Sequence, residues 1–239
     1  MLTLHPNHVS RARSQPWERD VNREAAAFVF NVSKSEVTED QRYLTKRAKY
    51  AGVYDITAAE LSRQLAKEAI FQSPEQCQKL INKAVEPPIR EWQQRVRATI
   101  MRDRVLGNSW GWTFDFSHLR LDRETYKRGY AFQPQSEIAF LMHHWGFLPL
   151  ATKIKEEYFH GSHINAHVHD ELVISVRPSI VYELMVFLRD SLERPRRYSA
   201  AGPLVVPCTW ALGRTWKGDV KWDKFPERDE VMSWVTKLV

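Results

Sequence analysis

Hydrophobic residues recur at helical spacing over most of the first hundred residues, with polar residues on the opposite side. Several of these stretches begin with a serine or threonine, whose hydroxyl accepts hydrogen bonds from the free backbone N–H groups of a helix start. After Thr38 and Thr57 a glutamine or glutamate follows three residues later, as in a capping box. The spacing predicts helices over residues 20–30, 38–54 and 57–70, and one long helix over residues 73–105 that bends at Pro87-Pro88.

The spacing of the hydrophobic residues changes in the second half of the chain. Short strands or an extended excursion are expected within residues 107–121, where aromatic and β-branched residues alternate with small ones. Between Ile164 and Val176 apolar and polar residues alternate around a polar tip, with Ile164, Ala166 and Val168 on one face, so we predict a β-hairpin. Around it the pattern predicts a helix from residue 135 toward 158 that Pro149 kinks or interrupts, a helix over 179–192 and a strand over 204–212. Helices followed by a small antiparallel sheet flanked by helices predict an α+β fold.

Length and charge narrow the class of protein. The chain has 239 residues, enough for one large domain or two subdomains, and residues 1–19 read as an irregular arm. Its 35 Lys and Arg against 29 Asp and Glu give a net charge of +6, which favours an anionic partner such as nucleic acid. Two cysteines indicate no disulfide framework, and no apolar run reaches the roughly 20 residues that span a bilayer. We expect a cytoplasmic protein with no membrane partner.

Two adjacent acids, Asp170 and Glu171, stand at the tip of the predicted hairpin. They are poor turn residues, because tight hairpins favour glycine or asparagine, and a broken local rule often marks a functional site. Carboxylate oxygens at a strand end suit Mg²⁺, whereas the alternative is an ordinary solvated turn. Zinc is a further alternative, since histidines crowd this region, but the remaining ligands of a zinc hydrolase are missing. These histidines are His160, His163, His167 and His169.

A second candidate lies on the helix after Thr38. Two cations and two tyrosines follow one another at steps of four, which places them along one slowly slanting face; they are Arg42, Lys46, Tyr50 and Tyr54. Such a face could be a solvated basic surface with two packed rings. Alternatively, the cations hold a triphosphate while an aromatic ring stacks on a base or sugar.

Taken together, these blocks resemble the C-terminal part of a family A DNA polymerase, the group of bacterial polymerase I and T7-type phage polymerases. The resemblance covers about residues 20–222 and keeps the family's order of motifs. The matching positions are Arg42, Lys46, Tyr50 and Tyr54 for motif B, R-x-x-x-K-x-x-x-F/Y-x-x-x-Y; Arg128 and Gln135 in RGYAFQPQSEIAFLM for the helix that contacts primer-template DNA; and His169, Asp170 and Glu171 for motif C, His-Asp-Glu.

The resemblance implies fingers over residues 20–106 and a palm-like subdomain over residues 107–239. It implies that Asp170, with His169 and Glu171 beside it, binds catalytic Mg²⁺ in two-metal nucleotidyl transfer from a dNTP to a primer 3′-hydroxyl. Arg42 and Lys46 would hold the β and γ phosphates of the dNTP. The two tyrosines of motif B would stack on the nucleotide and check the nascent base pair.

The chain also departs from the family's pattern. Motif A, D-x-S-x-x-E-L-R, supplies the other metal-binding aspartate and is not found in these 239 residues, although DFSHLR at Asp115 imitates it. Asn22 replaces a histidine, and Asp55 replaces the glycine after motif B. We therefore expect a split polymerase, in which a second polypeptide supplies motif A and the thumb. The alternative is a non-catalytic DNA-binding or replisome-docking module derived from a polymerase.

Overall fold

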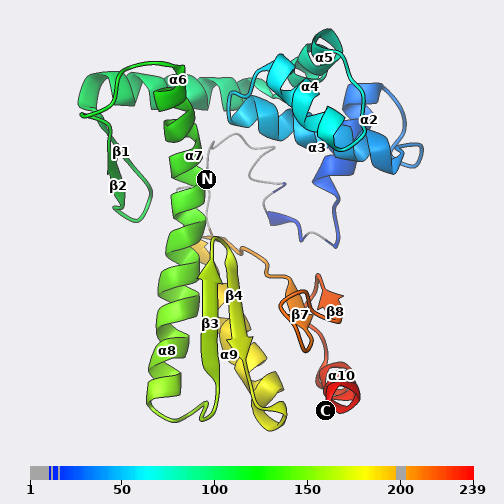
Figure 1. The fold of residues 1–239 in the computed structure, drawn as a ribbon, viewed down its shortest axis with the longest axis vertical. Helices are drawn as coiled ribbons and strands as arrows, with labels where there is room; N and C mark the ends of the chain where they lie inside the picture. The colour runs from blue at the N-terminus through cyan, green and yellow to red at the C-terminus, as the bar shows by residue number, and fades with distance from the viewer. Residues whose placement is uncertain (1–10, 12, 16, 198–202) are drawn as a thin grey trace. The chain divides into compact units, whose positions relative to one another are not determined.

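The computed structural model describes residues 11, 13–15, 17–197 and 203–239, so most of the expected N-terminal arm lies outside the described residues. The chain forms two compact units, which we call the N-terminal unit (mainly Glu18–Pro134) and the C-terminal unit (mainly Gln135–Val239). Both consist of helices with short antiparallel strand pairs (Figure 1), which confirms the α+β class. None of the helices in the described residues is both long and apolar enough to cross a bilayer.

The helices of the N-terminal unit begin at side-chain caps. Capping boxes are formed at Thr38 and Ser73, where the side chains of Gln41 and Gln76 reach back to the cap backbone. Thr57 accepts the backbone N–H of Glu60, so only one of the two bonds of the capping box predicted there is formed. Local capping therefore fixes where these helices start, as expected from the sequence. The helices are α2 (Val21–Phe30), α3 (Glu39–Val53), α4 (Ala58–Lys67), α5 (Pro74–Ala84) and α6 (Pro87–Asp103).

The expected long helix over residues 73–105 is wrong, because the structure has two helices there. Helix α5 ends at Ala84, and the next two residues, Val85 and Glu86, are extended with ψ of 108° and 148°. A residue before proline avoids the helical region, and proline is favoured at the first position of a helix. The Pro87-Pro88 pair therefore starts a new helix instead of bending an existing one.

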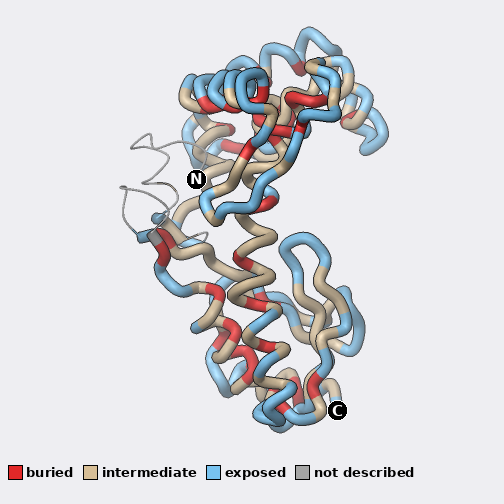
Figure 2. The backbone as a smooth tube through the Cα atoms, turned by 90° about the vertical axis from the view of Figure 1, so that its left-hand side faces the viewer, coloured by how far each residue is buried: buried red, intermediate tan, exposed pale blue. Residues whose placement is uncertain are grey.

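The core of the N-terminal unit positions α3. Its packing is close at Gly52, where an added Cβ would lie 2.0 Å from Cγ2 of Val85. The side-chain amide of Gln93 donates to the carbonyls of Gly52 (2.8 Å) and Val53 (3.0 Å). These two carbonyls at the C-terminal end of α3 thus gain a hydrogen-bond donor. Figure 2 shows that buried positions recur along the helices of this unit. Helix α3 is thus fixed along its length by burial and at its end by a hydrogen-bonding side chain.

The division between the units falls within helix α7 (Arg123–Leu141). This division lies further along the chain than residue 106, where the resemblance implies a boundary between fingers and palm-like subdomain; those two subdomain assignments stay predictions. Short strands are present as β1 (Val105–Gly107) and β2 (Thr113–Asp115), which pair antiparallel, and the start of α7 joins the N-terminal core. The buried aromatic side chains that hold them there are those of Phe116, Tyr126 and Tyr130.

The helix that follows is longer than the sequence pattern predicts. It begins at Arg123 instead of residue 135 and continues through a π-helical segment (Met142–Phe147) into α8 (Leu148–Lys155). Pro149 lies in the first turn of α8, so the expected disturbance takes the form of one wide turn directly before the proline.

The predicted hairpin is present as β3 (His163–Val168) and β4 (Glu171–Ser175), which Figure 1 shows side by side. A β-bulge interrupts the register between Ile164 and Ala166, so Asn165 is an extra residue in β3. Beyond it, His167 pairs with Leu172, and Val168 is 39% exposed. The expectation that Ile164, Ala166 and Val168 share one face is wrong, because an extra residue moves every later side chain to the other face.

The remaining elements complete the C-terminal unit. The expected strand over residues 204–212 is instead two short strands, which pair with different neighbours, and the C-terminal helix was not predicted. The strands of the described chain form separate two-stranded pairs instead of one sheet. These elements are a 3-10 turn (Pro178–Ile180), α9 (Val181–Leu192), β5 (Arg196–Arg197), β6 (Pro203–Leu204), β7 (Trp210–Leu212), β8 (Val220–Trp222) and α10 (Arg228–Leu238).

Helix α2 provides a pH-dependent contribution to stability. Glu24 is 16% exposed, and hydrogen bonds from Arg19 and Lys34 lower its pKa from 4.5 to about 2 against the opposing effect of burial. A depressed folded-state pKa stabilises the protein above the unfolded pKa, and this is lost as the pH falls toward 2. We expect Glu24→Gln to lower the free energy of unfolding by about 1 to 3 kcal/mol at pH 7 and by little at pH 2.

Urea unfolding of both proteins across this pH range measures the difference. A difference that stays constant from pH 7 to pH 2 would show that the ionised carboxylate of Glu24 is not responsible.

Candidate active site

The four positions of the predicted cationic face lie at one helix. Arg42, Lys46 and Tyr50 lie within α3, and Tyr54 is its C-cap residue. Tyr50 is 51% exposed, and its ring stacks on that of Tyr54 with 6.4 Å between centroids and 6° between planes. Burial raises the pKa of Tyr54, and Tyr50 adds to this effect. The helix thus presents two cationic side chains followed by a partly exposed aromatic pair.

Arg42 is held in place by an acid from the preceding helix. Its Nε donates to Oδ2 of Asp20 at 2.7 Å, while Oδ1 of Asp20 accepts the backbone N–H groups of Asn22 (3.0 Å) and Arg23 (2.9 Å). Burial opposes ionisation of Asp20, but these donors outweigh it and lower its pKa. One carboxylate therefore caps α2 and orients the guanidinium of Arg42, whose Nη1 also lies 3.8 Å from Oε2 of Glu39.

The next cation on the face is differently placed. Lys46 is exposed, and none of the described residues forms an ion pair with it. Its neighbour Arg47 instead pairs with Glu68 at 3.3 Å and donates to Gln64 at 3.3 Å. The two basic residues thus differ in their surroundings, because Lys46 is available to an anionic ligand and Arg47 already has an acidic partner.

Asp55 occupies the position at which the motif B pattern has a glycine, and its backbone explains that pattern. Its φ is +55°, in the left-handed region that glycine adopts freely and that aspartate tolerates better than most residues. Arg123 donates to both carboxylate oxygens of Asp55, at 3.2 and 3.0 Å, and to its carbonyl at 2.8 Å. The negative charge that replaces glycine is therefore balanced locally by Arg123.

The predicted DNA-contacting residues lie on α7. Arg128 and Gln135 are both exposed, and they are seven positions, or about two turns, apart. Ser136, next to Gln135, is buried. Asp115, which imitates motif A, lies in β2, where its carboxylate accepts the backbone N–H of Ser117 at 2.7 Å. That contact is a local turn interaction within the N-terminal unit.

Motif C forms the tip of the β3–β4 hairpin. Val168 pairs with Glu171, so the two-residue turn consists of His169 and Asp170 instead of the expected Asp170-Glu171. The φ of His169 is +54°, as the tight turns of two-residue hairpins require at their first position. Histidine is among the residues that tolerate this region better than most. The backbone strain at His169 places Asp170 at the exposed end of the turn.

The two acids of motif C have different surroundings. Oε1 of Glu171 accepts the indole N–H of Trp216 at 2.7 Å, whereas the carboxylate of Asp170 has no ion pair or hydrogen bond with any described residue. An exposed carboxylate suits Mg²⁺, which often takes only one or two protein oxygens together with waters and substrate phosphates. Within the described part of the chain, no three His, Cys, Asp or Glu side chains converge as a complete set of metal ligands.

One of the histidines that suggested zinc as an alternative, His167, makes ring contacts in the structure. His167 stacks on His143 and Phe147 of the π-helical segment, with centroids 6.1 and 5.9 Å apart. These contacts hold β3 against the helix. The bulge in β3 brings His167 to the side of the hairpin on which Leu172 lies, so its ring packs between secondary structure elements.

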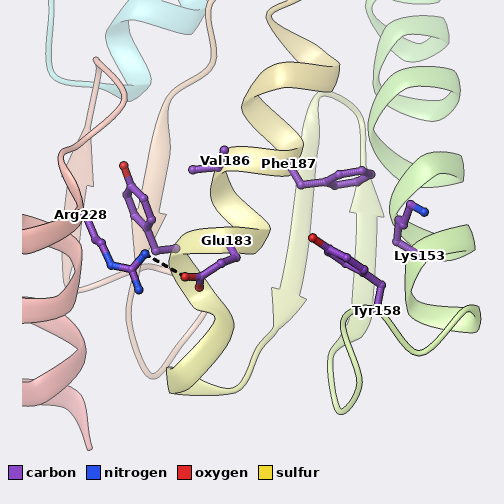
Figure 3. A pocket seen from close by; sticks show the side chains of 7 residues that line it. Lys153, Tyr158, Glu183, Val186, Phe187 and Arg228 are labelled. Atoms are coloured by element: carbon purple, nitrogen blue, oxygen red, sulfur yellow. Dashed lines mark ion pairs between the residues drawn. The ribbon is translucent and has the colours of Figure 1, made fainter.

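An open hollow of about 540 Å³ lies elsewhere in the C-terminal unit (Figure 3). Its cations are already paired, since Arg228 binds Glu183 at 3.0 Å and Lys153 binds Glu156 at 2.7 Å. The hollow contains none of the residues singled out in the sequence. Its lining residues are Lys153, Tyr158, Tyr182, Glu183, Val186, Phe187 and Arg228.

Sequence patterns missed the residues that hold the motif side chains. Asp20 could be found as a helix cap, but its second bond, to Arg42, joins residues 22 positions apart. Trp216 and Glu171 are 45 positions apart, and Arg123 and Asp55 are 68 apart. No periodicity or spacing predicts such pairs, because they depend on how the elements pack.

Comparisons with known proteins identify the family of the chain and a similar fold. Residues 11–218 match the family described as DNA polymerase family A. Among solved structures, the POL domain of Pol1 from M. smegmatis, in complex with DNA primer-template and dNTP, matches with a TM-score of 0.64 and 20% identity. The match covers 82% of this chain and 34% of that chain, so this chain spans about a third of it. No curated protein sequence gives a significant match. Because the family match covers most of the chain, the protein belongs to DNA polymerase family A.

Proposed function

We propose that this chain is the fingers and motif C portion of a template-directed DNA polymerase, which adds dNTPs to a primer 3′-hydroxyl. The observation that carries the proposal is the exposed carboxylate of Asp170, without a partner among the described residues, at the end of a strained two-residue turn. Residues 20–106 act as fingers and residues 107–239 as the palm-like part. The partners are primer-template DNA and dNTPs.

Each group of side chains has a role in this reaction. Arg42 and Lys46 bind the β and γ phosphates of the dNTP, and Asp20 keeps Arg42 oriented through their 2.7 Å contact. Tyr50 stacks on the incoming nucleotide, Tyr54 supports its ring, and Arg128 and Gln135 contact the primer-template.

Motif C provides the metal-binding end of the palm. Asp170 gives a carboxylate oxygen to Mg²⁺, while His169 and Glu171 fix the turn on either side of it. When bound, Mg²⁺ supplies charge neutralisation for the phosphates and lowers the pKa of the attacking hydroxyl. The protein's share of the catalysis is to hold nucleotide and primer terminus in the geometry of in-line attack.

The second metal-binding carboxylate comes from a separate polypeptide that carries motif A and a thumb. One aspartate cannot position two cations, and no further acid completes the set within the described residues. In that part of the chain, β3 and β4 pair only with each other, so a motif A strand would have an unpaired strand edge to pair with. Pairing of a motif A strand there would produce a large, obligate interface.

A reconstitution experiment tests this proposal. The purified chain is mixed with a polypeptide that carries a family A motif A and a thumb, and extension of a labelled primer on a template is measured with Mg²⁺ and dNTPs. We expect extension by the mixture, none by either component, and none when the partner's motif A aspartate is replaced by alanine. A mixture that binds DNA without extending the primer would instead identify the chain as a non-catalytic DNA-binding or replisome-docking module.

A further inference from the structure

Motif C is in contact with a tryptophan from a distant part of the C-terminal unit. The indole Nε1 of Trp216 donates to Oε1 of Glu171 at 2.7 Å. Glu171 is the first residue of β4 and directly follows the turn that contains Asp170. Trp216 is 55% exposed, so its ring is not held there by burial in a core. The contact therefore depends on the loop that carries the indole.

That loop, residues 213–219 between β7 and β8, is internally cross-linked. The backbone N–H of Asp219 donates to the carbonyl of Leu212 at 2.8 Å, and Oδ2 of Asp219 accepts the backbone N–H of Arg214 at 2.9 Å. Gly218, with φ of +73°, donates to the carbonyl of Thr215 at 3.0 Å. These bonds define the loop before any ligand binds, so the position of the indole is largely fixed.

The contact also separates the roles of two adjacent acids. A hydrogen bond to an ionised carboxylate is stronger than one between neutral groups, so the indole holds Glu171 in one orientation. Asp170 is left as the acid of motif C without a partner among the described residues. The φ of +54° at His169 is a strained conformation, and anchoring the next strand at Glu171 helps to maintain it.

We propose that Trp216 is a positioning residue of motif C, which fixes Glu171 and thereby holds the Asp170 carboxylate ready for Mg²⁺. This inference rests on the proposed polymerase function. Residues that orient a metal-binding turn without touching the metal typically contribute 10- to 100-fold to metal affinity or activity. Trp216→Phe removes only the N–H donor and keeps an aromatic ring, so it isolates this contribution.

The contact itself can be observed in the full chain without any activity. In a ¹H–¹⁵N spectrum, the indole resonance of Trp216 is identified among those of the nine tryptophans by its absence in Trp216→Phe. We expect Glu171→Ala to shift this resonance upfield, and Glu171→Gln, which keeps an acceptor oxygen, to shift it less. An indole resonance that is unchanged in Glu171→Ala would overturn the proposal.

The positioning role is measured in the reconstituted polymerase. We expect Trp216→Phe to lower kcat by about 10-fold or more and to raise the Mg²⁺ concentration for half-maximal rate, with the KM for dNTP nearly unchanged. Trp222→Phe is the matched control, because Trp222 also donates to a carboxylate, that of Glu230 at 2.5 Å, away from motif C. Equal effects of the two substitutions would overturn the positioning role.

Different results would contradict the proposed polymerase function and the positioning role of Trp216. If the unaltered complex extends no primer, the proposed function and the positioning role fall together, while the indole resonance still reports whether the contact exists. If the complex is active and the Mg²⁺ dependence of Trp216→Phe equals that of the unaltered chain, only the role of Trp216 is overturned.

Discussion

Asp170→Ala is expected to lower primer extension by the reconstituted polymerase about 10²- to 10³-fold. The substitution removes the carboxylate oxygen that motif C offers to Mg²⁺, and losing one stabilising group of this kind costs roughly 3 to 4 kcal/mol at the transition state. Asp170 is exposed and has no partner among the described residues, so its removal breaks no contact of the fold described above. The loss should therefore appear in kcat while the chain still folds and binds DNA.

Asp223→Ala is the matched control for this experiment. Asp223 is an exposed acid of the same unit that follows β8, and it forms no ion pair with a described residue. The control should retain the extension rate of the unaltered chain within about twofold. Extension by Asp170→Ala at a rate similar to that of the control would show that motif C does not contribute a metal ligand.

Arg42→Ala is expected to raise the KM for dNTP about 10- to 100-fold in the reconstituted polymerase. Charge-assisted hydrogen bonds to an anionic group are worth about 1.5 to 3 kcal/mol, and Arg42 keeps N–H donors beyond the one that Asp20 binds. The substitution also removes the partner of Asp20, but that carboxylate still caps α2 through the backbone N–H groups of Asn22 and Arg23.

Arg47→Ala serves as the comparison, since it removes the same side chain from the same helix at a position that is paired with Glu68. If both variants raise the KM for dNTP to the same extent, the effect reflects the general charge of α3. A specific phosphate contact requires that Arg42→Ala have the much larger effect, with kcat less affected than KM.

Local signals predict the helical part of the fold well. The caps at Thr38 and Ser73 are complete in the structure because each involves only residues three positions apart. The same local reasoning fails at Val85 and Glu86, where steric exclusion before proline outweighs the continuous helical pattern. It also misses α10, whose amphipathic face is stabilised by packing on α9.

The candidate site shows the same division between local and long-range information. The spacing of Arg42, Lys46 and Tyr50 predicts a shared helical face, and the structure has it, because helix geometry alone fixes that relation. The bonds of Asp20 to Arg42 and of Trp216 to Glu171 could not be predicted, since they are made by packing between elements. Motif spacing thus predicts which candidate residues share an element, and packing between elements decides which side chains hold them.

The extra residue at Asn165 gives β3 one point at which its length can change without moving the turn. Loss of Asn165 alone would remove the bulge and leave His167 opposite Leu172 and Val168 opposite Glu171, because the pairs on both sides of the bulge already match residue for residue. Loss of His167 would instead bring Ala166 opposite Leu172 and remove the ring that stacks on the π-helical segment. We therefore expect a one-residue change in length to be tolerated at the bulge and not between the bulge and Asp170.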